Sequence, residues 1–156
     1  MNNYGEATQP GRNFTWDELT RSSTASRLHI LNAPNAAQRA NLRALVSHVL
    51  QPVRDARGRP VRVDSAFRSA ALNRAIGGSD TSQHMTGEAA DIKVDGMTAP
   101  ELAAFIVRLG VPFDQVIAYP PELGGHVHVS YNVDGSNRRE TLWSPRKKSY
   151  EPREYA

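Results

Sequence analysis

The sequence predicts an α+β fold in which a small antiparallel sheet packs with several helices. Two segments, residues 36–57 and 98–110, repeat apolar side chains at the spacing of an amphipathic helix. Four shorter segments between Gly- and Pro-containing turns are expected to be strands, at residues 61–65, 88–94, 113–119 and 126–131. Because one short loop joins the last two, we expect them to be antiparallel neighbours.

Helix starts are indicated by two capping boxes, in which a Thr is followed three positions later by Glu. Thr15 and Glu18 indicate a short helix, and Thr98 and Glu101 indicate one that runs to Gly110. The second helix would bury Leu102, Phe105, Ile106 and Leu109. A further helix is expected over residues 69–76.

The long helix over residues 36–57 is the strongest secondary-structure prediction. Its buried stripe would consist of Leu42, Leu45, Val46, Val49, Leu50 and Val53. Pro52 is expected to kink or end the helix, because proline lacks the N–H that the helix ladder needs.

Length and composition fit one domain, since the chain has 156 residues, of which 39% are apolar and 22% charged. We predict a flexible lead-in over residues 1–13, a domain over residues 14–132 and an irregular basic tail over residues 133–156. The N-terminus lacks the apolar stretch of a signal peptide, and no apolar run is long enough to span a membrane.

The formal charge is +3, from 19 Lys and Arg against 16 Asp and Glu. Apart from Arg146, Lys147 and Lys148, these cations are scattered, and no groove-reading or base-stacking motif accompanies them. Nucleic acid is therefore not an expected partner. The chain has no cysteine, so a metal would have to be held by His, Asp or Glu.

Three of the five histidines fall in two short segments, residues 84–91, which also contain Asp91, and residues 126–128. His126 and His128 would project from one face of a strand, about 7 Å apart. Together with His84 and Asp91 they offer the nitrogen and oxygen ligands that zinc prefers. The spacing alone leaves a plainer interpretation open, in which the two histidines simply alternate with valines on a half-exposed strand.

Residues 82–91 resemble the Ser-x-His-x-x-Gly-x-Ala-x-Asp motif of the zinc D-alanyl-D-alanine carboxypeptidases and related L-alanyl-D-glutamate endopeptidases, which include phage endolysins. Residues 65–69, Ser-Ala-Phe-Arg-Ser, resemble the family's Ser-Gly-Tyr-Arg-Ser segment, and residues 126–131 resemble its last ligand strand. These three segments occur in the family's order between about Phe14 and Asn132.

The resemblance implies that one Zn²⁺ per chain is bound by His84, Asp91 and His128. It also implies that His126 lies beside the metal as a catalytic group and that Arg68 holds a carboxylate or carbonyl of the substrate. Ser82 and Gln83, at the start of the motif, are assigned to substrate binding.

One departure concerns the general base, because the family carries an acidic residue three positions before its last ligand and this chain has Gly125 there. Glu122, on the preceding loop, is the expected substitute. Glu88 lies an odd number of positions from Asp91 and is expected on the opposite strand face. His29 and His48 have no clustered partners and are assigned no chemistry.

The function implied is a zinc metallopeptidase that hydrolyses stem-peptide bonds of bacterial peptidoglycan, as a D,D-carboxypeptidase or an endopeptidase. A phage endolysin, released from the host cytoplasm to the cell wall on lysis, or a virion-associated lysin with phage proteins as partners would fit the expected absence of a signal peptide. The alternative is a non-catalytic, zinc-containing module that binds the wall or builds the virion.

Overall fold

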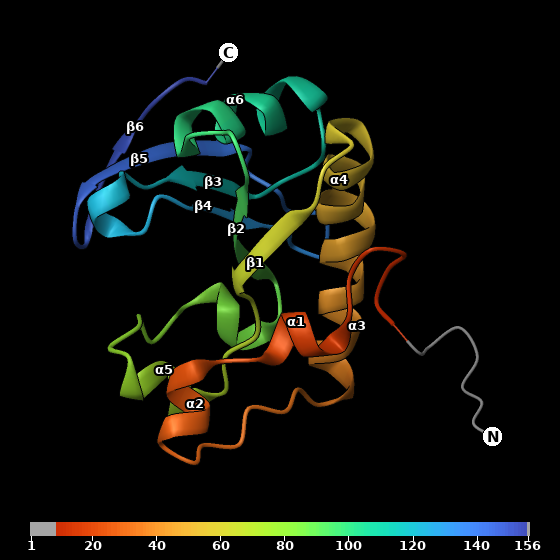
Figure 1. The fold of residues 1–156 in the computed structure, drawn as a ribbon, viewed down its shortest axis with the longest axis vertical. Helices are drawn as coiled ribbons and strands as arrows, with labels where there is room; N and C mark the ends of the chain where they lie inside the picture. The colour runs from red at the N-terminus through yellow and green to blue at the C-terminus, as the bar shows by residue number, and fades with distance from the viewer. Residues whose placement is uncertain (1–8, 156) are drawn as a thin grey trace.

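The computed structural model describes residues 9–155 and contains a six-stranded sheet in the order β1-β2-β4-β3-β5-β6 (Figure 1). The strands are β1 (Val61–Ser65), β2 (Ala89–Val94), β3 (Gln115–Ala118), β4 (Val127–Ser130), β5 (Glu140–Arg146) and β6 (Ser149–Pro152). All neighbours are antiparallel except β3 and β5, which run parallel. The predicted α+β class and the antiparallel pairing of β3 with β4 are confirmed.

The helical segments mostly follow the sequence signals. They are α1 (Trp16–Thr20), α2 (Ser23–Arg27), α3 (Ala36–Leu45), the π-helical η2 (Val46–Leu50), α4 (Gln51–Arg57), α5 (Ala70–Ala75), the 3₁₀ turn η3 (Gln83–Thr86), α6 (Ala99–Leu109) and the 3₁₀ turn η4 (Pro121–Leu123). Both predicted capping boxes form, at Thr15 and at Thr98. Helix α2 was not predicted.

The elements α3, η2 and α4 form the predicted long helix, and all six residues of its apolar stripe are fully buried. Pro52 does not end it. The wider π-helical turn lies immediately before this proline, at the place where a regular ladder would need its missing N–H. The helix ends at Gly58, whose φ of 70° is a left-handed conformation that glycine adopts without strain.

One face of the sheet packs into the hydrophobic core, and the opposite face carries the polar side chains of Asp91 and His128. On β2, Ile92 and Val94 are buried in the core, whereas Asp91 points to the opposite face. The same alternation on β4 buries Val127 and Val129 and leaves His128 beside Asp91. Helix α6 and the long helix lie on the core side (Figure 1).

Helix α6 buries its stripe only in part. Leu102 and Ile106 are in the core as predicted, but Phe105 is only partly buried and Leu109 is 37% exposed. Leu109 lies in the last turn, directly before the Gly110 that ends the helix.

The prediction of an irregular tail after residue 132 is wrong for residues 140–146 and 149–152, which form β5 and β6. Strand β5 pairs with β3, a partner far back along the chain that local periodicity cannot indicate. Trp143 packs against the core, and the buried Tyr155 donates a hydrogen bond from its hydroxyl to the Leu142 carbonyl.

Part of the predicted lead-in is packed against the long helix. Pro10 is buried, and the Asn13 N–H donates to Oε1 of Gln51 at 3.2 Å. Residues 1–8 of that prediction lie outside the described part of the chain. Within residues 9–155, no helix is both long and apolar enough to cross a bilayer.

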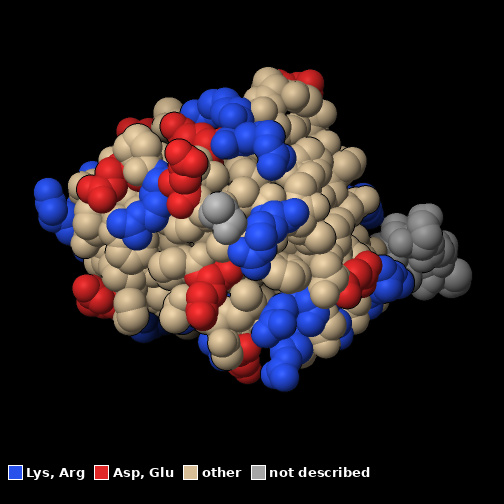
Figure 2. All heavy atoms as spheres, turned by 90° about the horizontal axis from the view of Figure 1, so that it is seen from above, with Lys and Arg blue, Asp and Glu red and all other residues tan. Residues whose placement is uncertain are grey.

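Charged side chains of both signs are interspersed on the face seen in Figure 2, where blue and red groups lie close together over the sheet and helix ends. Such mixing agrees with the scattered cations of the sequence. It gives this face no single sign of charge that would attract a polyanion along its length.

Candidate metal centre

The residues of the predicted metal site come from three separate elements. Asp91 on β2 and His128 on β4 are directly opposite in the antiparallel register, so their side chains leave the same face of the sheet. His84 lies in η3, a 3₁₀ turn that begins with the Ser82 hydroxyl accepting a hydrogen bond from the His84 N–H. Local turn structure and strand pairing together bring the three side chains to one point.

The ligand atoms of His84, Asp91 and His128 all lie within 4.8 Å of one another. Oδ1 of Asp91 is 3.3 Å from Nε2 of His84 and 3.2 Å from Nδ1 of His128. The three side chains are only 3%, 14% and 13% exposed, respectively. Such a group is small enough for one cation to touch all three atoms.

Hydrogen bonding orients His84 for metal binding. Its Nδ1 is 2.6 Å from the Ala66 carbonyl oxygen, an acceptor that requires a proton on Nδ1. The lone pair of the neutral ring is therefore on Nε2, the atom that faces Asp91. A backbone carbonyl behind a metal-bound histidine is a common arrangement of this kind.

The charge states also suit a cation. Burial alone would raise the pKa of Asp91, but His84 and His128 outweigh it and hold that pKa well below its ordinary value. Burial lowers the pKa of His128, although Asp91 opposes this effect. The site therefore favours a carboxylate at Asp91 and a neutral imidazole at His128, which are the forms that bind metals.

Zinc fits this donor set. Two imidazole nitrogens and one carboxylate oxygen are a frequent set of protein ligands for a catalytic zinc ion, which keeps a further position open. Cys is absent from the chain, so the nitrogen and oxygen donors are also the only zinc ligands that the sequence offers.

Gly87 is required between the first two ligands. Its φ is 81°, and a Cβ atom there would lie 2.6 Å from the Gln38 carbonyl oxygen of α3. Both the backbone conformation and the close approach to a helix therefore favour glycine at this position.

Arg68 and His126 both approach Oδ2 of Asp91, whereas His84 approaches Oδ1. Nη2 of Arg68 is 3.9 Å, and Nε2 of His126 is 3.8 Å, from Oδ2 of Asp91. Arg68 is also fixed by Asn73, whose Oδ1 accepts from Nη1 at 3.0 Å, and its side chain is only 13% exposed. His126 packs against the ring of Tyr119, with ring centroids 4.5 Å apart.

The loop between β3 and β4 explains why position 125 carries no acid. Gly124 and Gly125 have φ values of 111° and 67°, and a Cβ at Gly124 would lie 2.7 Å from Nδ1 of His126. An acidic side chain at position 125 would therefore need a left-handed backbone. Glu122, in η4 of the same loop, is exposed and lines the cleft that contains the three ligands.

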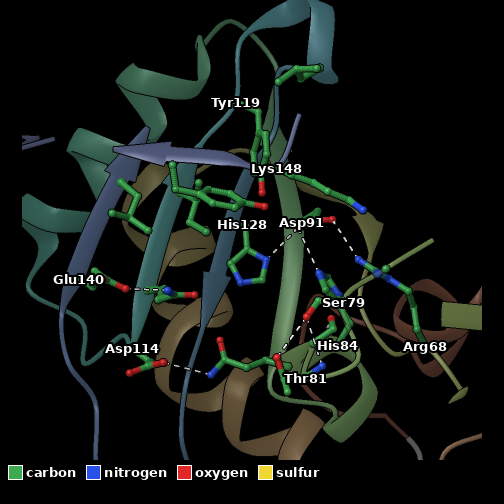
Figure 3. Close-up of a pocket in the computed structure, with 18 of the residues that line it drawn as sticks. Arg68, Ser79, Thr81, His84, Asp91, Asp114, Tyr119, His128, Glu140 and Lys148 are labelled. Atoms are coloured by element: carbon green, nitrogen blue, oxygen red, sulfur yellow. Dashed lines mark hydrogen bonds and ion pairs between the residues drawn. The ribbon is translucent and has the colours of Figure 1, made fainter. Parts of the chain in front are cut away.

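The cleft has a volume of about 1570 Å³ and extends across the sheet from Arg68 to the β5–β6 hairpin (Figure 3). Ser82 and Gln83 both line it, and the amide nitrogen of Gln83 donates to Oδ2 of Asp114 at 3.1 Å. Substrate binding by Ser82 and Gln83 remains a prediction. Glu88, by contrast, accepts from the Thr86 hydroxyl and makes no contact with Asp91 among the interactions of residues 9–155.

Several residues of the cleft were missed by sequence reasoning. Asp114 is fully buried and accepts three hydrogen bonds from Arg138, two from the guanidinium and one from the backbone N–H. Tyr119 lies over the site and is hydrogen-bonded to Tyr150 of β6. These pairs join the residues that flank β3 to the C-terminal segment that contains β5 and β6, so no local signal could have indicated them.

Comparison with known proteins identifies the family of the chain. Residues 12–130 match the family described as peptidase M15. The chain is 42% identical, over 134 residues, to the zinc D-Ala-D-Ala carboxypeptidase of Streptomyces albus G, a stretch that is 85% of this chain and 48% of that protein. The chain thus spans about half the length of this curated relative. The family match covers most of the chain and includes all three residues of the candidate metal centre, so the chain belongs to the peptidase M15 family.

Proposed function

We propose that this protein is a zinc-dependent peptidase that hydrolyses stem-peptide bonds of bacterial peptidoglycan. The observation that carries the proposal is the convergence of His84, Asp91 and His128 within 4.8 Å in an open cleft. The similarity to a protein named as a zinc D-Ala-D-Ala carboxypeptidase supports the substrate class. A role as a phage endolysin or as a virion-associated lysin remains a prediction that goes beyond the peptidase activity.

Each side chain of the site has a role that its position supports. A bound zinc ion would act as a Lewis acid toward the scissile carbonyl and acidify the attacking water molecule. Asp91 and the two histidines would hold that ion, with His84 kept in the correct tautomer by the Ala66 carbonyl. Arg68 would orient the substrate, since its guanidinium is fixed by Asn73 and matches a carboxylate in shape.

Proton transfer would fall to His126 and Glu122. His126 is close to the centre without belonging to the group of three ligands, so its imidazole can donate a hydrogen bond to charge that develops on the substrate. Glu122 lines the cleft from the β3–β4 loop and is the nearest substitute, along the chain, for the acid that Gly125 replaces. We assign it the role of general base.

The test is digestion of purified Gram-negative peptidoglycan by the protein as prepared, after chelation, and after zinc is restored. Mass spectrometry of the released fragments identifies the bond that is cut. We expect cleavage that stops with the chelator and returns with zinc. Bound zinc without any released fragment would overturn the proposal and favour the non-catalytic wall-binding or virion module.

The role of Glu122 is tested by Glu122→Gln, which keeps the shape of the side chain and removes the proton acceptor. We expect the cleavage rate to fall about 100-fold or more with zinc content unchanged, the size typical of general base catalysis. Glu154→Gln is the matched control, because Glu154 is exposed and is not among the residues that line the cleft. An unchanged cleavage rate in Glu122→Gln would show that a group other than Glu122 is the general base.

A further inference from the structure

The wall of the cleft opposite η3 is built by the β5–β6 hairpin, which lies beyond residues 12–130 of the family match. Lys147 and Lys148 form the tip of this hairpin, and both line the cleft, as do Leu142 and Tyr150 from its two strands. This part of the chain therefore contributes to the cleft without being part of the ligand motif.

The tip of the hairpin is fixed rather than loose. The fully buried Ser144 places its hydroxyl 2.8 Å from the Ser149 carbonyl oxygen and 3.2 Å from that of Arg146, the two residues that flank the tip. On β6, Tyr150 is hydrogen-bonded to Tyr119, which itself packs against His126. The hairpin is thus tied internally and, through Tyr119, to His126 beside the metal centre.

Lys148 has a backbone conformation that is unusual for its side chain. Its φ is 57°, a left-handed value that Gly or Asn adopts far more readily than Lys in a short turn. Residues held in such conformations occur often at functional sites. A lysine at this position suggests that its side chain is used.

The charge of Lys148 is also uncompensated, unlike that of the two arginines in the cleft. Arg138 is paired with Asp114 and Glu140, and Arg68 lies beside Asp91. Among residues 9–155, neither Lys147 nor Lys148 forms an ion pair. Figure 3 shows the Lys148 side chain extending along the cleft to the side of Asp91 where Arg68 lies.

We propose that Lys148 is a specificity residue that, together with Arg68, binds the free C-terminal carboxylate of the peptide substrate. Both cations lie beside the metal centre, so a carboxylate held between them would belong to the residue that leaves with the new amine. The substrate class would then be peptides cut next to their C-terminus, and the enzyme would act as a carboxypeptidase. This inference rests on the proposed peptidase function.

The test measures binding as well as cleavage, using an N-acetylated tripeptide that ends in D-Ala-D-Ala and its C-terminal amide. Zinc-loaded wild-type protein should bind the free acid at least about 10-fold more tightly than the amide, by calorimetry. Lys148→Gln should weaken binding of the acid about 10-fold and leave binding of the amide unchanged. In cleavage assays the same variant should raise KM for the acid with little change in kcat.

Three further variants control for charge and folding. Lys148→Arg should restore the preference for the acid. Arg146→Gln removes a cation from the same hairpin outside the residues that line the cleft and should leave the preference intact. Lys148→Gly should lose the preference without lowering the melting temperature, since glycine suits the left-handed backbone.

The outcomes separate this proposal from the peptidase proposal. Cleavage by the wild type with an unchanged acid preference in Lys148→Gln would overturn the role of Lys148 and leave the peptidase standing. Equal binding of acid and amide by the wild type, or binding of neither, would also overturn it. Loss of the preference in Lys148→Gln, in a protein that binds the acid without cutting it, would support the carboxylate site and count against the peptidase.

Discussion

The two walls of the cleft are built differently. On the β2–β4 side, His84, Asp91 and His128 are at most 14% exposed, and each is held by another protein group. On the β5–β6 side, Lys147 and Lys148 are exposed and form no ion pair among the described residues. The candidate metal centre is therefore preorganised by contacts within the protein, whereas neither lysine on the opposite wall is held by an ion pair within residues 9–155.

Replacing a residue of the candidate metal centre should have the largest effect, because it removes one of the groups that build the buried wall of the cleft. His84→Ala removes one of three donors and leaves the buried Ala66 carbonyl without its partner. We expect bound zinc, measured by mass spectrometry of the metal, to fall well below one per chain, and cleavage to fall by at least about 100-fold, since even supporting contacts of zinc ligands are worth 10- to 100-fold.

The matched control is His48→Ala, because His48 is exposed and stacks on Tyr131 outside the cleft-lining residues. It should keep both zinc and activity. Full zinc content in His84→Ala would show that a different set of ligands holds the metal.

Gly87→Ala should destabilise the wall that carries the metal ligands, because it strains the backbone between His84 and Asp91. The left-handed conformation and the approach to the Gln38 carbonyl together should lower the free energy of unfolding by about 2–3 kcal/mol. Denaturation in urea measures this change. Gly96→Ala is the comparison, since Gly96 has a φ of 86° but no atom within 4 Å of an added Cβ, and should lose only about 1 kcal/mol.

The ion pair between Asp114 and Arg138, at the junction of the two walls of the cleft, should weaken at low pH. Hydrogen bonds from Arg138 outweigh burial and lower the pKa of Asp114 to about 2. A carboxyl group whose pKa is depressed by folding stabilises the protein above its ordinary pKa of 3.8 and loses that contribution as the pH falls through about 2. We expect a loss of up to about 2 kcal/mol over this range.

Urea denaturation of the wild type and Asp114→Asn from pH 5 to pH 2 measures that contribution. The variant should be less stable at pH 5, and the difference should shrink toward pH 2, because protonation removes the same charge from the wild type. A difference in the free energy of unfolding that stays constant with pH would mean that the negative charge of Asp114 does not contribute to stability.

The elements that the sequence predicted correctly are those with local signals. The capping boxes at Thr15 and Thr98 need only three residues of separation, and the stripe from Leu42 to Val53 needs only helical periodicity. The candidate metal ligands could be predicted because a motif and a short His-x-His spacing indicate them without reference to any distant partner.

Only the tertiary structure decided the other half of the cleft. Strand β5 forms by parallel pairing with β3, and Asp114 and Tyr119 acquire partners from segments that are distant in the sequence. Such pairings leave no periodic trace in either segment, because their free energy comes from contacts made after the chain has folded back on itself. The sequence by itself therefore determined most of the helices and the ligand motif, and long-range strand pairing decided what faces that motif across the cleft.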